Sequence, residues 1–412
     1  MSGRRALLPI FLIVLVDVFG LTLVIPLLAI YAEHFHATPL DATLLITVYA
    51  LFQLVSGPLL GQASDHMGRK PLLLLSQVGT LIGFLVMAGA QSLWMIFLAR
   101  IIDGATAGNL SLAQAYISDN TAPEDRAKSF ALIGIAFGVG FFLGPALTGV
   151  LTAHYGLRAP IFAAAGMSLL SILCTATLLP HQKIARDPAA VEAGPGGKRL
   201  SLLSWGQYAK FFARPGLGGL LVQFFAYMFC FSIFTSGFAL FAERTFTWKG
   251  HAFSPVEIGY LFAYVGFLGI ILQGGLIGRL VKRFGEPALV FSGFVTVAAA
   301  YAGLGFIHSV GLLIAVATVS SYGNGVLRPT LTSLITQRAG RSEQGVVLGL
   351  NQSLNSVAQM AAPVLAGLLI EKHFLSTWAM AASAAALVGL GLARWGSSRS
   401  RASTEPAAPI AG

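Results

Sequence analysis

Long apolar stretches follow one another along the whole chain, with short polar segments between them. A helix needs about 20 apolar residues to cross a bilayer, whereas the strands of a membrane barrel are shorter and alternate in polarity. We therefore expect an all-α integral membrane protein with twelve transmembrane helices. The twelve stretches are Leu7–Tyr31, Ala42–Leu60, Leu72–Ala90, Leu93–Tyr116, Ser129–Ala153, Pro160–Leu179, Leu217–Phe241, Val256–Leu280, Ala288–Ile307, Val310–Ile335, Val346–Ile370 and Leu375–Trp395.

The main polar interruption, His181–Pro215, divides these stretches into two sets of six. It is rich in Pro, Gly and basic residues, a composition typical of a linker. We predict a six-helix bundle over residues 1–180, a cytoplasmic linker over 181–215, a second six-helix bundle over 216–396 and a disordered tail over 397–412. The segment Leu200–Phe212 mixes aromatic and basic residues, which fits either an interfacial amphipathic helix or a plain linker.

Short patterns from the first half return in the second half at a nearly constant offset. The matching pairs are Gly61 with Gly278, Gly68 with Gly285, Pro145 with Pro363 and Gly149 with Gly367. Two membrane halves that repeat in register are typical of secondary transporters, in which the substrate path runs between the halves.

Composition and charge narrow the class of protein further. The chain is 56% hydrophobic and only 10% charged, with a net charge of +10. A basic excess can indicate nucleic-acid binding, but here all except six of the 26 Lys and Arg residues fall on one side of the predicted spans, the side of the N-terminus. This asymmetry places both termini in the cytoplasm of an inner-membrane protein and argues against a nucleic-acid partner. The six exceptions are Arg158, Arg244, Lys249 and Lys372 on the outer side and Arg100 and Arg328 within spans.

Four charged residues lie well inside predicted spans: Asp17, Arg100, Asp103 and Arg328. A charge at mid-membrane is costly and therefore faces a cavity or a partner. Arg100 and Asp103 share one helix face, so they form either a structural pair or a proton-coupling group. Asp17 has no local partner, which favours a role in carrying protons, although a hydrogen bond across helices is an alternative. We assign proton coupling to Asp17, Asp103 and Arg100.

Polar residues inside the C-terminal spans are candidates for the substrate cavity. A lone cation such as Arg328 invites an anionic group, whereas any single amide or hydroxyl equally suits a hydrogen bond between helices. The candidates are Gln223, Tyr227, Tyr264, Asn324, Arg328, Asn351, Gln352 and Asn355.

Four stretches of the N-terminal half carry a family resemblance: Asp17–Leu28, Gly61–Lys70, Arg100–Gly104 and Gly138–Gly149. They resemble motifs of the major facilitator superfamily, and especially of its proton-coupled drug antiporters in the tetracycline-exporter branch. The resemblance implies two pseudo-symmetric six-helix bundles that alternate access to a central site. It also implies that Gly61, Asp65, Gly68, Arg69, Gly144 and Pro145 control the conformational change.

Within this resemblance, Asp65 is expected to meet the positive end of a helix in the other half, near Ser342. The second copy of the loop has Lys282 at the matching position, so only one side should carry this acidic contact. The tetracycline-exporter branch has further acids in its third and ninth helices. The matching positions here are Gly83 and Thr296, which weakens tetracycline as the substrate.

The sequence thus predicts a secondary transporter that exports small amphipathic molecules or drugs in exchange for protons. The alternative is a uniporter or symporter of an organic anion or metabolite that uses Arg100 and Arg328. We expect a monomer whose partners are substrate, protons and membrane lipids, with no cofactor beyond the proton gradient and no metal. An enzyme is disfavoured because no nucleophile–base or metal cluster is evident.

Overall fold

The chain is described from a computed structural model. The structure describes residues 3–120, 126–179, 205–339 and 344–402. The predicted linker therefore falls largely outside the described residues, and so do Ser342 and the side chain of Asp65.

Helices dominate both halves of the described chain. The N-terminal half contains α1 (Gly3–Val24), α2 (Leu28–Glu33), α3 (Pro39–Met67), α4 (Arg69–Ala88), α5 (Leu93–Ala105), α6 (Asn109–Asn120), α7 (Arg126–Tyr155) and α8 (Ala159–Leu178). The C-terminal half contains α10 (Trp205–Ala213), α11 (Leu217–Thr245), α12 (Pro255–Ile271), the π-helical turn η1 (Leu272–Leu276), α13 (Ile277–Phe284), α14 (Glu286–Leu304), α15 (Val310–Arg338), α16 (Gln344–Glu371) and α17 (Leu375–Ala402). A two-stranded hairpin, β1 (Thr247–Trp248) and β2 (His251–Ala252), joins α11 to α12.

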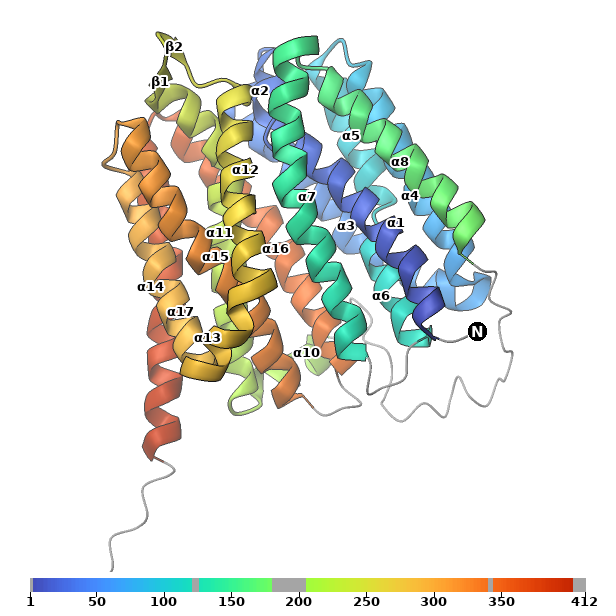
Figure 1. Cartoon of the computed structure of the whole chain (residues 1–412), viewed down its shortest axis with the longest axis vertical. Helices are drawn as coiled ribbons and strands as arrows, with labels where there is room; N and C mark the ends of the chain where they lie inside the picture. The colour runs from blue at the N-terminus through green and yellow to red at the C-terminus, as the bar shows by residue number, and fades with distance from the viewer. Residues whose placement is uncertain (1–2, 121–125, 180–204, 340–343, 403–412) are drawn as a thin grey trace, which may run out of the picture.

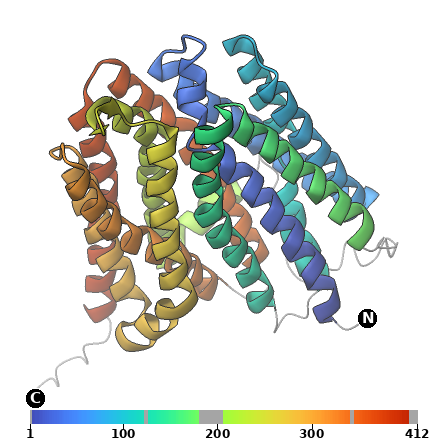
Figure 2. The ribbon, with the colours of Figure 1, turned by 45° about the horizontal axis from the view of Figure 1, so that its top comes forward.

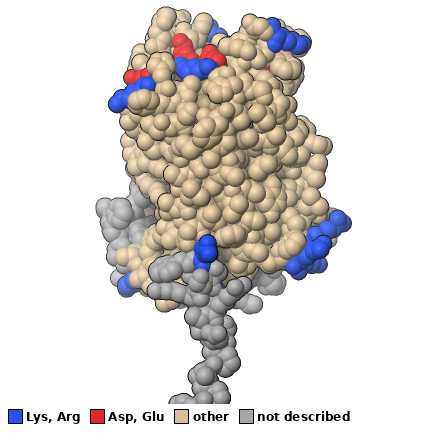
Figure 3. Space-filling model, turned by 90° about the vertical axis from the view of Figure 1, so that its left-hand side faces the viewer, with Lys and Arg blue, Asp and Glu red and all other residues tan. Residues whose placement is uncertain are grey.

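Ten of the described helices are long and apolar enough to cross a membrane, and Pro9–Val24 forms a shorter apolar helix. The remaining predicted span, Leu93–Tyr116, is divided by a break into α5 and α6. Together these segments make up the predicted twelve-helix fold in two bundles. In Figure 3 the charged side chains gather at the two ends of the face shown and leave an uncharged belt between them, as expected for a protein that crosses a membrane.

Several boundaries differ from the sequence prediction. The first span ends at Val24 because Pro26 cannot continue a helix, and α2 resumes from Leu28. The helix α17 runs to Ala402, into the segment predicted to be a disordered tail, because nothing in that sequence breaks a helix that is already formed. The helix α10 occupies the later part of the segment for which a helix or a plain linker was expected.

Local chemistry sets where the helices begin. Thr38 and Asp41 form a capping box before α3, and Ser254 and Glu257 form another before α12. Gly68 separates α3 from α4 with φ of 94°, a backbone conformation that other residues resist. Gly285 plays the same part between α13 and α14, with φ of 78°. Of the repeated glycines, Gly68 and Gly285 thus form tight turns at matching places in the two halves.

The N-terminal bundle (blue to green) and the C-terminal bundle (yellow to red) lie side by side in Figures 1 and 2. We call the end where α1 begins and α17 ends the terminus end, and the opposite end, which carries α2 and the hairpin, the distal end (Figure 1). The bundles meet along two main contacts, α7 against α12 and α3 against α16.

Both contacts are tight in their distal halves. A side chain at Gly259 would lie 2.6 Å from the carbonyl oxygen of Pro145, and one at Gly266 would lie 2.6 Å from the backbone of Phe142. On the other contact, Thr47 donates a hydrogen bond of 3.0 Å to the carbonyl of Met360. The bundles are therefore closed against each other at the distal end.

The same contacts loosen toward the terminus end. On α7 and α12, a side chain added at Gly138 or Gly269 would meet no atom within 4 Å among the described residues. The same holds for Gly61 on α3 and Gly349 on α16. Among the described residues, the close backbone contacts between the bundles are therefore found in the distal half and are missing at these four positions toward the terminus end.

Candidate functional site

Asp17 lies on α1 among polar side chains of two neighbouring helices. Gln77 of α4 and Ser171 of α8 are its hydrogen-bonding neighbours. Gln77 also donates a 2.8 Å hydrogen bond to the hydroxyl of Ser171, and both of these side chains are fully buried. The carboxyl group of Asp17 is thus held in a small polar site inside the N-terminal bundle.

Arg100 and Asp103 form an ion pair at the end of α5. Their side chains are each 6% exposed, and the distance from Nη1 of Arg100 to Oδ2 of Asp103 is 3.0 Å. The guanidinium of Arg100 also lies 4.3 Å from the ring centroid of Tyr49 on α3. Asp103 is close enough to Asp17 for their charges to interact. The structure therefore brings together the three residues that we assigned to proton coupling.

The chain breaks its helix directly behind Asp103, between Ala105 and Asn109. Ser76 of α4 fills the break, since its hydroxyl accepts a 2.9 Å hydrogen bond from the amide of Gly108 and donates to the carbonyl of Thr106. A side chain on Gly79 would overlap Thr106. Close packing of α4 against the break thus fixes the position of the ion pair.

Arg328 occupies a different environment from Arg100. It lies on α15 in the C-terminal bundle, and its guanidinium sits 5.2 Å from the ring centroid of Phe137 on α7 of the N-terminal bundle. Its side chain is exposed, and no carboxylate lies within ion-pair distance of it in the described part of the chain. Arg328 therefore faces the space between the bundles as a cation without an anion.

The other predicted cavity residues divide into separate groups. Tyr227 donates a 3.3 Å hydrogen bond to the carbonyl of Asn324, and the Asn324 amide donates to Ser320 at 2.9 Å, so these two belong to a network beside Arg328. The hydroxyl of Tyr264 shares a hydrogen bond with Thr318 instead, as a contact between α12 and α15.

The amides of α11 and α16 are not brought into that network. Asn351 is only 5% exposed, and neither of its side-chain polar atoms has a hydrogen-bond partner among the described residues. Gln352, the residue after Asn351, is partly exposed. Asn355 lies one turn further along α16. Gln223, on α11, is 6% exposed. These residues remain candidates by position alone.

The loop motif at the terminus end makes contacts within its own bundle. Lys70 is 7% exposed and donates hydrogen bonds of 2.7 Å and 2.6 Å to the carbonyls of Ala176 and Leu179, at the end of α8. Arg69 donates to the hydroxyl of Ser64. Among the described residues, no atom lies within 4 Å of the position that a side chain at Gly61 would take.

The Gly144–Pro145 pair lies where three helices meet. A side chain at Gly144 would overlap Thr22 of α1, and the carbonyl of Pro145 faces Gly259 of α12 in the other bundle. The hydroxyl of Thr148 donates a 2.6 Å hydrogen bond to the carbonyl of Leu23, which joins α7 to α1. A rigid α1–α7 unit thus forms one side of the contact between the bundles.

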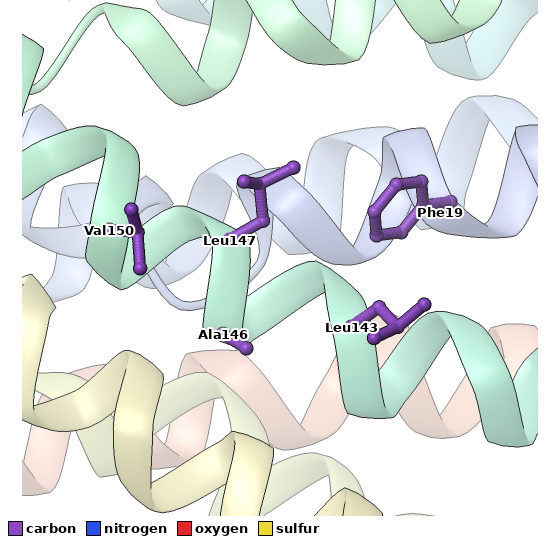
Figure 4. A pocket seen from close by; sticks show the side chains of 5 residues that line it. All are labelled: Phe19, Leu143, Ala146, Leu147 and Val150. Carbon is purple, nitrogen blue, oxygen red and sulfur yellow. The ribbon is translucent and has the colours of Figure 1, made fainter.

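A pocket of about 350 Å³ lies elsewhere (Figure 4). It is lined by Phe19 of α1 and by Leu143, Ala146, Leu147 and Val150 of α7, and it has no polar lining. Leu143 and Val150 are about 40% exposed, so the pocket is an apolar depression in the outer surface. It contains none of the predicted site residues, and we do not assign it to the transport path.

Some residues of the site were not named from the sequence. The acids are surrounded by Gln77, Ser171 and Tyr49. In a sequence, an uncharged polar residue within an apolar span fits a hydrogen bond between helices as well as a functional site. Gln77 and Ser171 interrupt their apolar spans, so a list of polar positions in the first half would have included them. At the distal end, Arg244 pairs with Glu33 of the other bundle. The two residues are far apart in the sequence, so their contact was not predicted.

Comparison with known proteins agrees with this architecture. The family model described as the Major Facilitator Superfamily matches residues 10–363 and again 249–411. The chain belongs to this superfamily. Its relatives include the class B tetracycline resistance protein of Escherichia coli, 30% identical over 369 residues that cover 89% of this chain and 88% of that protein. The bovine major facilitator superfamily domain-containing protein 10 is 29% identical over 343 residues, which cover 81% of this chain and 74% of that protein.

Solved structures share the fold. The human organic anion transporter MFSD10 superposes with a TM-score of 0.71 at 24% identity, covering 95% of this chain and all of that one. An auto-inhibited POT-family peptide transporter gives the same TM-score at 13% identity, covering 99% of both chains. The chain is therefore a multi-pass membrane transporter of small molecules and not an enzyme.

Proposed function

We propose that the protein exports small amphipathic molecules in exchange for protons by alternating access. One observation carries the proposal: Asp17, which is only partly exposed and lies beside Gln77 and Ser171, is within electrostatic reach of the Arg100–Asp103 ion pair. A carboxyl group deep in a membrane protein changes charge at a cost that its neighbours set, so its protonation can be linked to the conformation of the bundle.

Within this proposal the two acids have different parts. Arg100 favours the ionised form of Asp103, because its guanidinium is in direct contact with that carboxylate. Asp17 has only uncharged hydrogen-bonding neighbours, so it is the group that accepts a proton from one side and releases it to the other. One proton that enters down about 150 mV supplies roughly 3.5 kcal/mol, which sustains about a 300-fold substrate gradient.

The direction of transport follows from the predicted orientation. The excess of basic residues supports a cytoplasmic terminus end in the inner membrane. Because the close contacts between the bundles are found in the distal half, we take this structure as an inward-facing state, in which substrate enters and the proton leaves. Labelling of cysteines introduced at Lys249 and Arg279 tests the orientation, because the two positions are expected on opposite sides of the membrane. Since one chain supplies both halves of the path, we expect it to act as a monomer.

The alternative function, uniport or symport of an organic anion, was expected to use Arg100 and Arg328. Arg100 is paired with Asp103 and lies against Tyr49, so only Arg328 supports this alternative function. MFSD10, which shares the fold, is an organic anion transporter. Proton coupling separates the two functions, because a uniporter does not respond to a pH gradient.

The test is uptake into proteoliposomes with and without an imposed pH gradient. Two probes share a xanthene ring system and differ in charge: carboxyfluorescein is an anion and rhodamine 123 is a cation. We expect Asp17→Asn to abolish uphill accumulation of the transported probe while downhill exchange continues. Glu286→Gln, which alters a carboxylate bound to Ser333 outside the site, should transport normally. Uphill accumulation by Asp17→Asn, Asp103→Asn and the double variant alike would overturn the proposal.

A further inference from the structure

Arg328 lies close to the middle of the membrane. It precedes the end of α15 at Arg338 by ten residues, which corresponds to about 15 Å along a helix axis. Phe137, the aromatic residue that it faces, stands at a similar depth on α7, eleven residues from Arg126. Since the apolar part of a bilayer is about 30 Å thick, the guanidinium is far from either surface.

No described residue neutralises this charge. Asp17 and Asp103 are the only acids at this depth among the described residues, and Asp103 is paired with Arg100 at 3.0 Å. The guanidinium of Arg328 donates no hydrogen bond to a described side chain or carbonyl, and its contact with Phe137 is to the face of a ring. A permanent cation in this position is expensive unless an anion compensates it.

The charge is also accessible. The Arg328 side chain is exposed although its helix position is deep, and Gly138, next to Phe137, has no neighbour where a side chain would stand. Because the guanidinium faces α7 of the other bundle, we infer that this exposure comes from the space between the bundles on the side of the terminus end. A solute that enters this space from the terminus end reaches Arg328.

Aromatic rings adjoin the cation on both sides of the space. Phe137 stacks on Phe141 along α7, with centroids 6.3 Å apart. Across from them, Tyr227 is close enough to act on Arg328 electrostatically and stacks on Phe231, while its hydroxyl is committed to the carbonyl of Asn324. Tyr227 itself is only 2% exposed, so the aromatic surface beside the cation comes from Phe137, Phe141 and Phe231, which are partly exposed.

We propose that Arg328 binds the anionic group of the substrate, and that the substrate is an organic anion with a carboxylate on an aromatic body. The inference rests on the proposed function, since it names the substrate class of that exporter. Arg100 takes no part in binding because it is buried and paired with Asp103. Export of an anion in exchange for a proton moves two charges per cycle, both in the direction that an inside-negative potential favours.

The experiment measures binding of carboxyfluorescein and rhodamine 123 to the full chain purified in a neutral detergent, by fluorescence anisotropy. For Arg328→Gln we expect carboxyfluorescein affinity to fall at least tenfold, whereas Arg328→Lys should stay within about threefold of the unmodified protein, since it keeps the charge. Arg328→Glu should reverse the preference and bind rhodamine 123 more tightly than carboxyfluorescein. Arg279→Gln, which removes an exposed cation on α13, is the control and should bind as the unmodified protein does.

A second measurement separates binding from folding. Because Arg328 has no anionic partner among the described residues, Arg328→Gln should unfold at the same or a higher temperature than the unmodified protein without ligand; a structural role would lower that temperature. The proposal is overturned if Arg328→Gln binds carboxyfluorescein undiminished, or if the unmodified protein binds rhodamine 123 and not carboxyfluorescein.

The two proposals can fail separately. Binding of carboxyfluorescein that depends on Arg328, together with transport that ignores the pH gradient, keeps the anion site and removes the antiporter. Accumulation of rhodamine 123 that depends on Asp17 and is unchanged in Arg328→Glu keeps the antiporter and removes the anion site.

Discussion

Lys70, the last residue of the loop motif, makes a structural contact within its own bundle. The loop Gly61–Lys70 resembles an element that controls switching between conformations, but Lys70 reaches into its own bundle. Its ammonium group sits at the carbonyl end of α8, where the helix dipole is negative and the last carbonyls lack partners within the helix. Lys70 therefore stabilises the N-terminal bundle itself.

Replacement of this lysine should weaken the fold. Lys70→Met removes two charge-assisted hydrogen bonds in a buried place, and we expect a loss of roughly 1–3 kcal/mol in stability. Thermal unfolding in detergent measures it. Lys282→Met, which alters an exposed lysine in the second copy of the loop, is the matched control and should leave the unfolding temperature unchanged. Equal unfolding temperatures for the two variants would show that Lys70 is a surface charge.

At the scale of single residues, the sequence predicted the charged members of the site and missed the neutral ones. Asp17, Arg100, Asp103 and Arg328 stand out because a charge inside an apolar span is rare. The partners of Asp17 come from α4 and α8, and which faces of those helices meet depends on packing that a single sequence does not specify. The neutral partners were therefore not named, whereas the three-residue spacing of Arg100 and Asp103 and the isolation of Arg328 already indicated a paired and an unpaired arginine.

The positions that align with additional acids of the tetracycline-exporter branch are occupied differently here. A side chain at Gly83 would lie 3.0 Å from the β-carbon of Asp103, so glycine at this position allows α4 to approach the ion pair. Thr296 donates hydrogen bonds of 2.9 Å to two carbonyls of its own helix, Ser292 and Gly293. Neither position contributes a negative charge, which agrees with a path whose unpaired charge is the cation Arg328.

At the scale of elements, helix interruptions were the features that hydropathy could not predict. The break after α5 and the π-helical turn η1 both fall within stretches that were predicted to be single continuous spans. Hydropathy measures whether a segment can cross the membrane and is insensitive to a local change in hydrogen bonding. Hydropathy therefore predicted the number and length of the spans and did not predict the interruptions within them.

The π-helical turn is placed where a hinge would act. It lies at Leu272–Leu276 on the helix that contacts α7, just beyond the point where the two bundles separate. Gly274 and Gly275 are exposed, and a side chain on either would meet no atom within 4 Å in the described structure. Mid-helix π turns are often functional, and two glycines favour deviation from a regular helix.

We expect the double variant Gly274→Ala/Gly275→Ala to stiffen this hinge. Alanine favours a regular helix by roughly 0.5–1 kcal/mol per residue relative to glycine, and the space around both positions accommodates it. Turnover of the transported probe in proteoliposomes should fall severalfold, while binding affinity in detergent stays constant. Gly269→Ala, on the same helix and equally free of neighbours, controls for the effect of alanine. A similar fall in turnover for Gly269→Ala would rule out a specific role of the turn.

At the scale of the whole molecule, the distal contact between the bundles decides the conformation. It combines glycine-mediated packing of α7 on α12 with polar contacts, among them the ion pair of Arg244 with Glu33 and the hydrogen bond of Thr47 to Met360. The sequence predicted two bundles with a path between them. It gave no sign of which end is closed, because one set of residues must serve both the inward-facing and the outward-facing state.

A small wedge in that contact should shift the equilibrium. Alanine at Gly266 would place its β-carbon 2.6 Å from backbone atoms of Phe141 and Phe142, which cannot move aside as a flexible side chain does. We expect Gly266→Ala to force α7 and α12 apart at the distal end and to favour closure at the terminus end. Gly269→Ala adds the same methyl group three residues away, where it meets nothing, and should leave the conformation unchanged.

Distances between spin labels measure this shift directly. Labels at Tyr155 and Trp248 report the distal end, and labels at Met67 and Phe284 report the terminus end; all four side chains are exposed. Cys174 and Cys230 are first replaced by alanine, since both are free thiols. For Gly266→Ala the distal distance should lengthen while the terminus distance shortens, because the bundles rock as rigid bodies about the site between them. If the distal distance lengthens while the terminus distance is unchanged, the bundles do not rock as units, and the tight distal contact is local packing with no control over the open end.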